Sequence, residues 1–309
     1  MYASKAQEYL DAQSMPSTDG YELKRSEHRF PDGAHYRIEV PTINSPAALR
    51  ALLGSLENFD VTVNRLSVTY GIMRFLDEEI IDMLDQAREY GAEVFMMVGP
   101  RAVLDIGAQA HIHTLNAQHV AYRLRGTDQL VYGLEDALRA IDLGCRGILV
   151  CDQGLLYVLN QMRKDGTIPP DVQFKASVLL GTTNYAAMRV IADIGADSVN
   201  IQRDMPLPMI AGFRMDSDLP IDVHANNPDQ TGGFLRTFDV PEMVLTSAPI
   251  YIKTGNIAVP SHSMMVDEGA GLRMAREVAM TERHIRKYAP ESVQTKRHEK
   301  SLAIPVARG

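Results

Sequence analysis

Cysteine is scarce in this chain. The 309 residues contain only Cys145 and Cys151, and both lie around a predicted buried strand. Two thiols cannot supply the four ligands of an iron–sulfur cluster or of a zinc knuckle. We therefore interpret them as reduced, buried thiols of a cytoplasmic protein and expect no iron–sulfur cluster.

Several signals of other protein classes are missing. No apolar run approaches the roughly 20 residues of a membrane-spanning helix, and residues 1–15 are too polar for a secretion signal. The net charge is −8 and no basic run is longer than Lys296-Arg297, which argues against a nucleic-acid partner. No Gly-x-Gly-x-x-Gly turn follows the first predicted strand, which disfavours a dinucleotide-binding fold. We expect a cytoplasmic homo-oligomer without nucleic-acid or membrane partners.

The chain does have a regular spacing of predicted helices and strands. Predicted helices end at Gly91, Gly144 and Gly195, about 50 residues apart, and a strand follows each glycine directly. Each interval has room for two strand–helix units. The resulting unit of about 26 residues predicts eight strands, at 36–42, 64–70, 93–99, 120–125, 147–152, 172–178, 198–203 and 220–226. Amphipathic helices are expected between them, at 45–58, 75–90, 128–143, 153–165, 184–194 and 206–216.

Alternating strands and helices predict an α/β protein with parallel strands. Eight units in a chain of this length suit a (β/α)8 TIM-type barrel, with an open doubly wound sheet as the rival. The predicted organisation is a leader at 1–34, a barrel core at 35–227 and a C-terminal extension at 228–309. The extension begins with a loop around Gly232-Gly233, either a lid or a plain surface excursion. An extended segment at 243–254 and a closing helix at about 264–288 follow.

Three predicted strands break the rule for a buried parallel strand. Residues 172–177, 198–202 and 221–226 alternate apolar and polar side chains, whereas strands covered by helices are usually apolar on both faces. Buried polar groups without partners are costly. The alternation therefore predicts a shared polar cavity at the mouth of a barrel, where such enzymes place their chemistry. Its polar face carries Lys175, Ser177, Asn200, Gln202, Asp222, His224 and Asn226.

The predicted mouth is rich in cations and amides. Arg123 and Arg125 lie two residues apart on a predicted strand and share a face. Together with Lys175 they predict a small ligand that bears a carboxylate or a phosphate, although internal salt bridges without a ligand remain the alternative. Ser177, Asn200, Gln202 and Asn226 are further candidate substrate-binding residues. Asn184 either caps the sixth helix or opens an anion site at the helix N-terminus.

His224 beside Asp222 is the candidate general acid/base pair, because histidine titrates near neutral pH and a carboxylate orients it. Asp152 either binds a divalent metal or caps the following helix. We count Lys175 on the sixth strand, where class I aldolases of this architecture place their Schiff-base lysine. Its alternative role is that of a charge partner for Asp152 or Asp222. A loose group of His111, His113 and His119 is a weaker metal candidate.

From about residue 64 to residue 226 the chain resembles the peptidase U32 family. The residues that carry the resemblance are Val150-Cys151-Asp152-Gln153-Gly154-Leu155, Ser177 with Thr183-Asn184, Gly195-Ala196-Asp197-Ser198-Val199 with Arg203-Asp204, and Asp222-Val223-His224-Ala225. The resemblance implies a barrel and a polar pocket built from Asp152, Ser177, Asn184, Arg203, Asp204 and His224. It also implies hydrolysis of peptides. Other members of the family are implied to hydroxylate RNA bases or ubiquinone precursors with the help of an iron–sulfur cluster. Here Asn226-Asn227-Pro228 stands where the cluster cysteines would begin, and Asp204 replaces the usual Glu.

Three functions follow from these patterns. The first is a U32-like barrel enzyme that acts on a small anionic molecule or a peptide, with His224, Asp222, Asp152 and Lys175 as catalytic candidates. The second is a Schiff-base lyase that uses Lys175. The third is a non-catalytic barrel that binds a ligand or supports a partner chain. No His-Glu-x-x-His motif or Ser-His-Asp order supports a particular hydrolytic mechanism.

Overall fold

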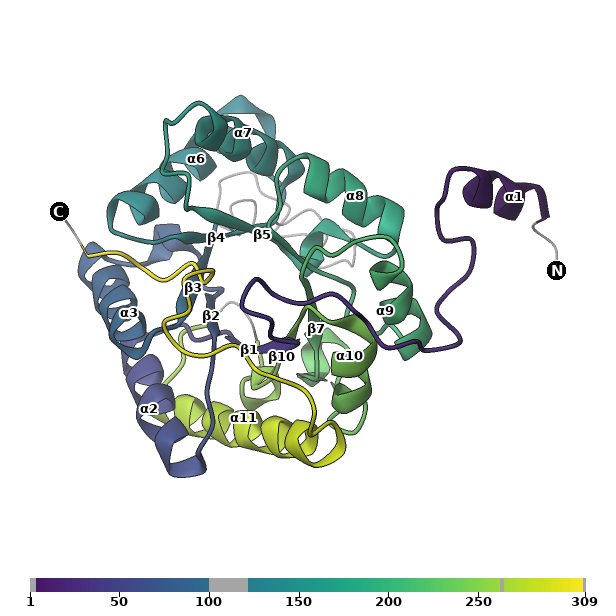
Figure 1. Ribbon diagram of the computed structural model, residues 1–309. Coiled ribbons are helices and arrows are strands. Elements are labelled where there is room, and N and C mark those ends of the chain that lie inside the picture. The colour runs from purple at the N-terminus through teal and green to yellow at the C-terminus, as the bar shows by residue number, and fades with distance from the viewer. Residues whose placement is uncertain (1–3, 100–121, 262–263, 308–309) are drawn as a thin grey trace.

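A closed barrel of eight parallel strands forms the centre of the computed structural model, which describes residues 4–99, 122–261 and 264–307 (Figure 1). The strand order around the barrel is β1-β10-β7-β6-β5-β4-β3-β2. The predicted TIM-type fold is therefore confirmed. The strands are β1 (Tyr36–Pro41), β2 (Arg65–Val68), β3 (Glu93–Met97), β4 (Gly147–Val150), β5 (Gln173–Ala176), β6 (Ser198–Asn200), β7 (Ile221–His224) and β10 (Ile250–Lys253).

Helices alternate with these strands and form the outer ring in Figure 1. They are α2 (Pro46–Leu56), α3 (Asp77–Tyr90), α6 (Gly126–Asp142), α7 (Gln153–Lys164), α8 (Tyr185–Asp193), α9 (Leu207–Arg214), α10 (Val240–Ser247) and α11 (Glu268–Tyr288). An additional helix, α1 (Ser4–Ala12), precedes the barrel. The shorter elements are η1 (Glu57–Phe59), η2 (Ile72–Arg74), η4 (Val178–Leu180), η5 (Asp229–Thr231), η6 (Asn256–Ala258) and the antiparallel pair β8 (Asn226–Asn227) and β9 (Phe234–Leu235).

Local sequence explains where these helices begin and end. The side chains of Ser45 and Asp267 accept hydrogen bonds from the third backbone N–H beyond them, at the starts of α2 and α11. Gly91 ends α3 in the left-handed conformation, with φ 87°, and Gly144 and Gly195 also have positive φ just after α6 and α8. A side chain at these glycines would be strained. The regularly spaced glycines therefore mark helix ends, as the sequence predicts.

The strand predicted at 120–125 is wrong for its described part. Residues 122–125 form a turn before α6, and β3 pairs directly with β4, from Phe95↔Gly147 to Met97↔Leu149. This pairing leaves no place for a strand between them. The prediction assumed a constant strand–helix unit of about 26 residues. It was wrong here because the connection from β3 to β4 is much longer than one unit.

The true eighth strand is β10, which pairs with β7 and β1 and closes the barrel. The sequence interpretation placed it in an extended segment at 243–254, outside the barrel. The structure instead divides that segment into helix α10 and strand β10. The barrel therefore does not end at residue 227, and α11 is its eighth helix rather than an addition to it.

Burial divides each strand into two faces. The outward side chains are apolar and pack against the helices, among them Ile38, Leu66, Val94, Ile148, Val199 and Ile252. Many inward side chains are polar and still almost fully buried, including Glu39, Lys175 and Asp222. The alternation in the sequence therefore marks the inner face of the barrel, as predicted.

The amino-terminal end of the barrel is covered by both ends of the chain, which cross it in Figure 1. From the leader, Phe30 stacks edge-on against Tyr251 with 5.3 Å between ring centroids. From the tail, the Ala303 N–H donates to Glu93 Oε2 at 3.2 Å. The carboxyl ends of the parallel strands point to the opposite end of the barrel, where enzymes of this fold place their chemistry. None of the described helices is long and apolar enough to cross a membrane.

Two glycines in the helical ring predict opposite effects on stability. A Cβ added at Gly54, on the exposed side of α2, meets nothing within 4 Å, whereas one at Gly271 on α11 would lie 2.2 Å from the Ala48 carbonyl oxygen of α2. Gly54→Ala should raise the free energy of unfolding by about 0.5–1 kcal/mol. Gly271→Ala should lower it by about 1–3 kcal/mol through overpacking. Urea unfolding measures both, and equal shifts would contradict the tight α2–α11 contact.

Candidate active site at the carboxyl end of the barrel

The barrel interior has two unlike halves. Toward the carboxyl ends of β3 and β4 it is apolar, with Phe95, Met97, Leu149 and Cys151 packed in one cluster. On the side of β1, β5, β6, β7 and β10 it is polar and charged. Since buried charges are stable only when they are paired, the contacts of this polar half decide which groups are structural and which remain reactive.

Lys175 lies at the centre of the polar half and is completely buried. Its Nζ forms ion pairs with Oε2 of Glu39 and, at 2.9 Å, with Oδ1 of Asp222. Arg65 donates to the same Asp222 oxygen at 3.0 Å. The structure thus gives Lys175 the role of a charge partner for Asp222. It also places Lys175 on the fifth barrel strand, so the count that put it on the sixth strand is wrong.

Glu39 and Asp222 form a pair of neighbouring carboxyl groups with different acidities. Burial alone would raise the pKa of Glu39, but the positive charges of Lys175 and Lys253 hold it well below its usual range. Burial raises the pKa of Asp222 to about 6, because the loss of hydration outweighs the attraction of Lys175 and Arg65. No described residue donates a hydrogen bond to Asp222 Oδ2. The raised pKa allows Asp222 to carry a proton below about pH 6.

Lys253, which sequence reasoning missed, is the second lysine of this half. It is the last residue of β10, and its side chain is 5% exposed, with Nζ 3.2 Å from Glu39 Oε1. When the Asn200 amide is oriented so that its nitrogen donates to the Asp222 carbonyl, its oxygen accepts from Lys253 Nζ at 2.9 Å. Burial, helped by the nearby charge of Lys175 and opposed by the attraction of Glu39, lowers the pKa of Lys253 to about 8.

The signal that could have revealed Lys253 is present in the sequence. Ile250-Tyr251-Ile252-Lys253 alternates apolar and polar side chains, as the other polar-faced strands do. Tyr251 and Lys253 therefore share the inner face with Asp222 and His224, their partners in register on β7. His224 ends β7, next to Lys253, and is 1% exposed. The predicted pair of Asp222 and His224 is thus brought together with an amine at the carboxyl end.

Two predicted cationic residues lie at the mouth, but not on one strand. The Arg123 guanidinium donates to the carbonyl oxygens of Cys151 at 2.7 Å and Leu179 at 3.2 Å. Arg125 precedes α6 and is exposed, with its backbone N–H bonded to Gln129. The shared inner face predicted for them is therefore wrong, because residues 122–125 are not a strand.

Arg203, which follows β6, is a cation with spare hydrogen-bonding capacity. Its buried Nε has no hydrogen-bond partner among the described residues. Burial lowers the pKa of this guanidinium, and the nearby Tyr122 raises it. A buried donor without a partner is costly, so an anionic group from a ligand would satisfy it.

Three other predicted residues cap helices. Asp152 accepts from Leu155 N at 3.0 Å at the start of α7 and also from Leu124 N. Asn184 accepts from Ala187 N at the start of α8. Ser177 accepts from Leu179 N at the start of η4. For Asp152 and Asn184 the structure shows the capping alternative, and their roles with a metal or an anion stay predictions without a supporting contact.

The remaining two candidates, Gln202 and Asn226, differ in how firmly hydrogen bonds hold their side chains. Gln202 makes one long contact, from Nε2 to the Val178 carbonyl at 3.4 Å. Asn226 donates to Thr254 Oγ1 and to Glu277 Oε2 and accepts from Ile257 N. These bonds use both amide protons of Asn226, so its side chain fastens the barrel rim to α11 rather than offering donors to a ligand.

Metal-binding groups are not assembled in the described ranges. Within residues 4–99, 122–261 and 264–307, no three His, Cys, Asp or Glu side chains are grouped so that they could hold a metal ion. His111, His113 and His119 lie outside these ranges. Cys145 and Cys151 are free and buried, and burial raises the pKa of each thiol to about 11. Neither is therefore an activated nucleophile at neutral pH.

The fold and the site together define a TIM-type barrel with a charged interior and a lysine amine near its mouth. No protein-family model matches the chain, and no curated protein matches it. Solved barrels that it resembles include the U32 peptidase Mk0906, at 14% identity over 72% of this chain and 93% of that one, with a TM-score of 0.43. A KDPGal structure has 10% identity, covers 86% of this chain and 99% of its own, and has a TM-score of 0.49.

A third similar barrel is the YdjI aldolase from Escherichia coli K12. It has 16% identity, covers 82% of this chain and 90% of its own, and has a TM-score of 0.46. At these identities the likeness concerns the fold alone.

Proposed function

We propose that this protein is an enzyme that forms an imine between Lys253 and the carbonyl group of a small anionic organic compound. The observation that carries the proposal is the position of Lys253 Nζ, buried near the mouth between Glu39 and Asn200 and beside His224. An amine kept partly neutral at physiological pH is the nucleophile that this chemistry needs.

Lys175 is a poorer nucleophile than Lys253. Its Nζ is bound to two carboxylates of the interior, Glu39 and Asp222, and its side chain is fully buried. The positive charge of Lys175 instead acts on its neighbours, since it lowers the pKa of Lys253. A second cation beside a reactive lysine is a known way to activate it. The Schiff-base role considered for Lys175 therefore passes to Lys253.

The neighbouring groups can supply the proton transfers of imine formation. The neutral Lys253 amine attacks the carbonyl carbon, a proton reaches the carbonyl oxygen, and the carbinolamine loses water to give the imine. Asp222, with its pKa raised to about 6, and His224 are the acid/base groups beside the amine. Glu39 stays ionised and stabilises the positive charge of the protonated imine.

The anionic character of the substrate follows from the cations at the same end. Arg203 has an unsatisfied donor, and Arg123 stands between the ends of β4 and β5. A guanidinium binds a carboxylate or a phosphate in a planar, two-point manner. The substrate class that we propose is therefore a small oxo acid or a phosphorylated carbonyl compound.

Reductive trapping tests this proposal. The full-length protein is incubated with pyruvate, glyoxylate or glyceraldehyde 3-phosphate, reduced with borohydride and weighed by mass spectrometry. We expect a stable single adduct with at least one probe, and peptide mapping should place it on Lys253. Absence of an adduct with all three probes, or adducts scattered over surface lysines, would argue for a barrel that binds a ligand without catalysis.

The pH dependence of trapping gives a second expected outcome. Because the pKa of Lys253 is lowered from 10.5 to about 8, the neutral amine becomes the main form as the pH rises through about 8. The rate of adduct formation should therefore increase with a midpoint near this value in a stopped-time borohydride assay. A midpoint near that of an ordinary lysine would show that the burial of Lys253 does not tune its reactivity.

Hydrolysis of peptides or small amides, as the peptidase U32 resemblance implies, is the second candidate. Asp222 and His224 lie together on the inner face of β7, in the matching motif, and provide an acid/base pair for an attacking water molecule. Release of new amino groups from a mixed peptide substrate, lost in His224→Ala, would support this candidate. A trapped Lys253 adduct without peptide cleavage would exclude it.

A further inference from the structure

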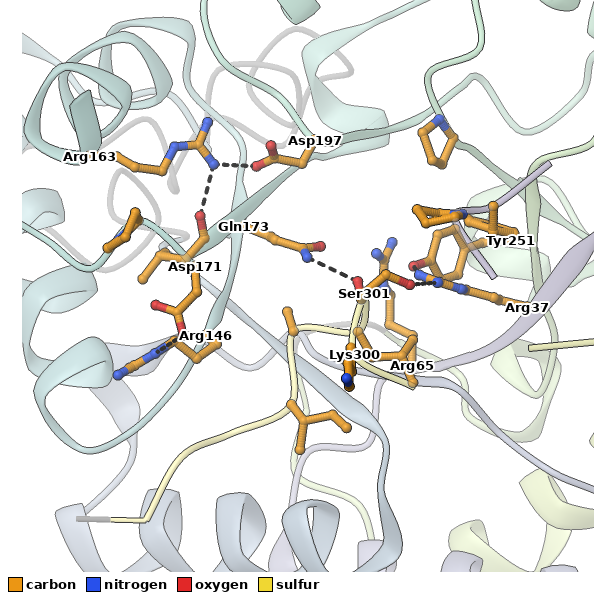
Figure 2. Close-up of a pocket in the computed structure, with 18 residues that line it drawn as sticks. Arg37, Arg65, Arg146, Arg163, Asp171, Gln173, Asp197, Tyr251, Lys300 and Ser301 are labelled. Atoms are coloured by element: carbon orange, nitrogen blue, oxygen red, sulfur yellow. Dashed lines mark hydrogen bonds and ion pairs between the residues drawn. The ribbon is translucent and has the colours of Figure 1, made fainter. Parts of the chain in front are cut away.

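A cavity lies at the amino-terminal end of the barrel, opposite the proposed active site. Its volume is about 410 Å³, and its walls come from the first residues of several strands and from the C-terminal tail. This size falls in the usual range of small-molecule sites. Figure 2 shows that the labelled side chains surround one open space, with Lys300 and Ser301 of the tail on one side.

Positively charged side chains dominate this cavity. The cations that line it are Arg37, Arg65, Arg146, Arg163 and Lys300, whereas the carboxylates that line it are Asp171 and Asp197. Asp171 pairs with Arg146 at 3.1 Å and Asp197 pairs with Arg163. Both pairs belong to the outer wall, where Asp171 is 60% exposed.

The barrel interior does not cancel this charge. Among the described residues, ion pairs connect six cations, namely Arg37, Arg65, Arg146, Arg163, Lys175 and Lys253, with five carboxylates, namely Glu39, Glu93, Asp171, Asp197 and Asp222. Lys300 is the seventh cation and belongs to none of these pairs. Seven cations thus face five carboxylates, although the whole chain has a net charge of −8. A local positive excess in a half-enclosed space attracts an anion.

The cavity is also preorganised for recognition. Arg37, 3% exposed, lies over the Phe30 ring at 4.0 Å. Its guanidinium is held by Thr295, Tyr251 and Ser301 through one donor each on Nε, Nη1 and Nη2. Nη1 also lies 3.9 Å from Glu93 Oε1, whereas the second proton of Nη2 is used by no hydrogen bond among the described residues and remains for a ligand. A rigid arginine loses little conformational entropy on binding.

Lys300 adds an exposed cation to the lining of the cavity. Its side chain is exposed and has no ion-pair partner within the part of the chain that the structure describes. The neighbouring Ser301 carbonyl accepts from Gln173 Nε2 at 3.2 Å, which ties this part of the tail to β5. A ligand in the cavity would therefore touch both the barrel and the tail.

We propose that this amino-terminal cavity is a binding site for a small ligand that bears a phosphate or carboxylate group, separate from the site at the carboxyl end. Arg65 lines the cavity and also donates to Asp222. The bound anion would thus lie one side chain away from the proposed acid/base group. This link gives the ligand a direct route to influence the chemistry at the other end.

Calorimetric titration of the full-length protein with inorganic phosphate and, separately, with citrate tests the site. We expect saturable binding of at least one probe, weakened about tenfold or more by Lys300→Glu. Lys296→Glu is the matched control, because it makes the same charge change four residues earlier on the same tail, outside the cavity lining. It should change the affinity less than twofold. Stronger binding of phosphate or of citrate identifies the preferred anionic group.

Three results would overturn the proposal. The first is that neither probe binds saturably to the wild-type protein. The second is equal weakening by Lys300→Glu and Lys296→Glu, which would reflect overall charge alone. The third is loss of binding in Arg203→Gln with full binding in Lys300→Glu, which would place the anion at the carboxyl end. Since calorimetry needs no turnover, the result is independent of the imine chemistry.

Discussion

Lys253→Met is expected to abolish the borohydride-stable adduct, with a decrease of at least about 100-fold in the trapped fraction. Methionine has nearly the same length and shape as lysine but no amine. Glu39, the ion-pair partner of Lys253, keeps its contacts with Lys175 and Ser67, so the interior retains most of its charge pairing. The loss of trapping would then report the missing nucleophile rather than unfolding.

Two further variants make this test specific. Lys253→Arg preserves the positive charge but cannot form an imine under these conditions, so it should also give no adduct. Lys296→Met removes an exposed lysine of the tail and should leave trapping unchanged. Circular dichroism confirms that each variant is folded. Full trapping in Lys253→Met, with the label mapped to Lys175, would instead identify Lys175 as the nucleophile.

Lys175→Met is expected to have the largest effect on stability, a loss of about 3–5 kcal/mol in the free energy of unfolding. Lys175 is fully buried and binds Glu39 and Asp222 at once. Without its ammonium group, two carboxyl groups would face each other in the barrel interior. Removal of one partner from a buried ion pair costs more than the pair contributes, because it leaves a charge uncompensated.

The pH dependence of this loss has a definite sign. The pKa of Asp222 is raised from 3.8 to about 6 in the folded protein. Its contribution to stability is therefore fully present below about 3.8 and is lost as the pH rises through about 6. Removal of the Lys175 charge raises this pKa further. The difference between Lys175→Met and wild type should thus be larger at pH 8 than at pH 5.

Urea unfolding at the two pH values measures this difference. Asp222→Asn combined with Lys175→Met should recover part of the lost stability, since it removes one of the two opposed carboxyl groups. Lys296→Met, at an exposed position, serves as the control and should change stability by less than about 0.5 kcal/mol. A Lys175→Met variant as stable as wild type at both pH values would show that the buried pairs contribute little.

The fold was largely predictable because it rests on local patterns. The glycine positions after α3, α6 and α8 reveal the helix ends, and the alternation in β5, β6 and β7 reveals an inner polar face. These signals depend on neighbours in sequence. The error at 120–125 arose where the connection between two adjacent strands is long, so the regular spacing no longer applied.

The candidate site was predictable only in part. Asp222 and His224 were found from their alternation on one strand, and they do share the inner face. The pairing of Lys175 with Glu39 could not be deduced, because the two residues are 136 positions apart. Lys253 was missed because β10 was not recognised as a barrel strand. Asp152 and Asn184 looked like site residues, since helix caps use the same residue types as ligand sites.

The sequence by itself determined the class of fold, the polar inner face and the scarcity of thiols, because each of these depends on residue type and local spacing. Only the tertiary structure decided which buried charges neutralise one another. It made Lys175 an ion-pair partner and left Lys253 as the amine near the mouth. It also brought the tail and the first residues of the strands together around the amino-terminal cavity. The physical reason is that charge pairing and desolvation depend on distances between residues far apart in the chain.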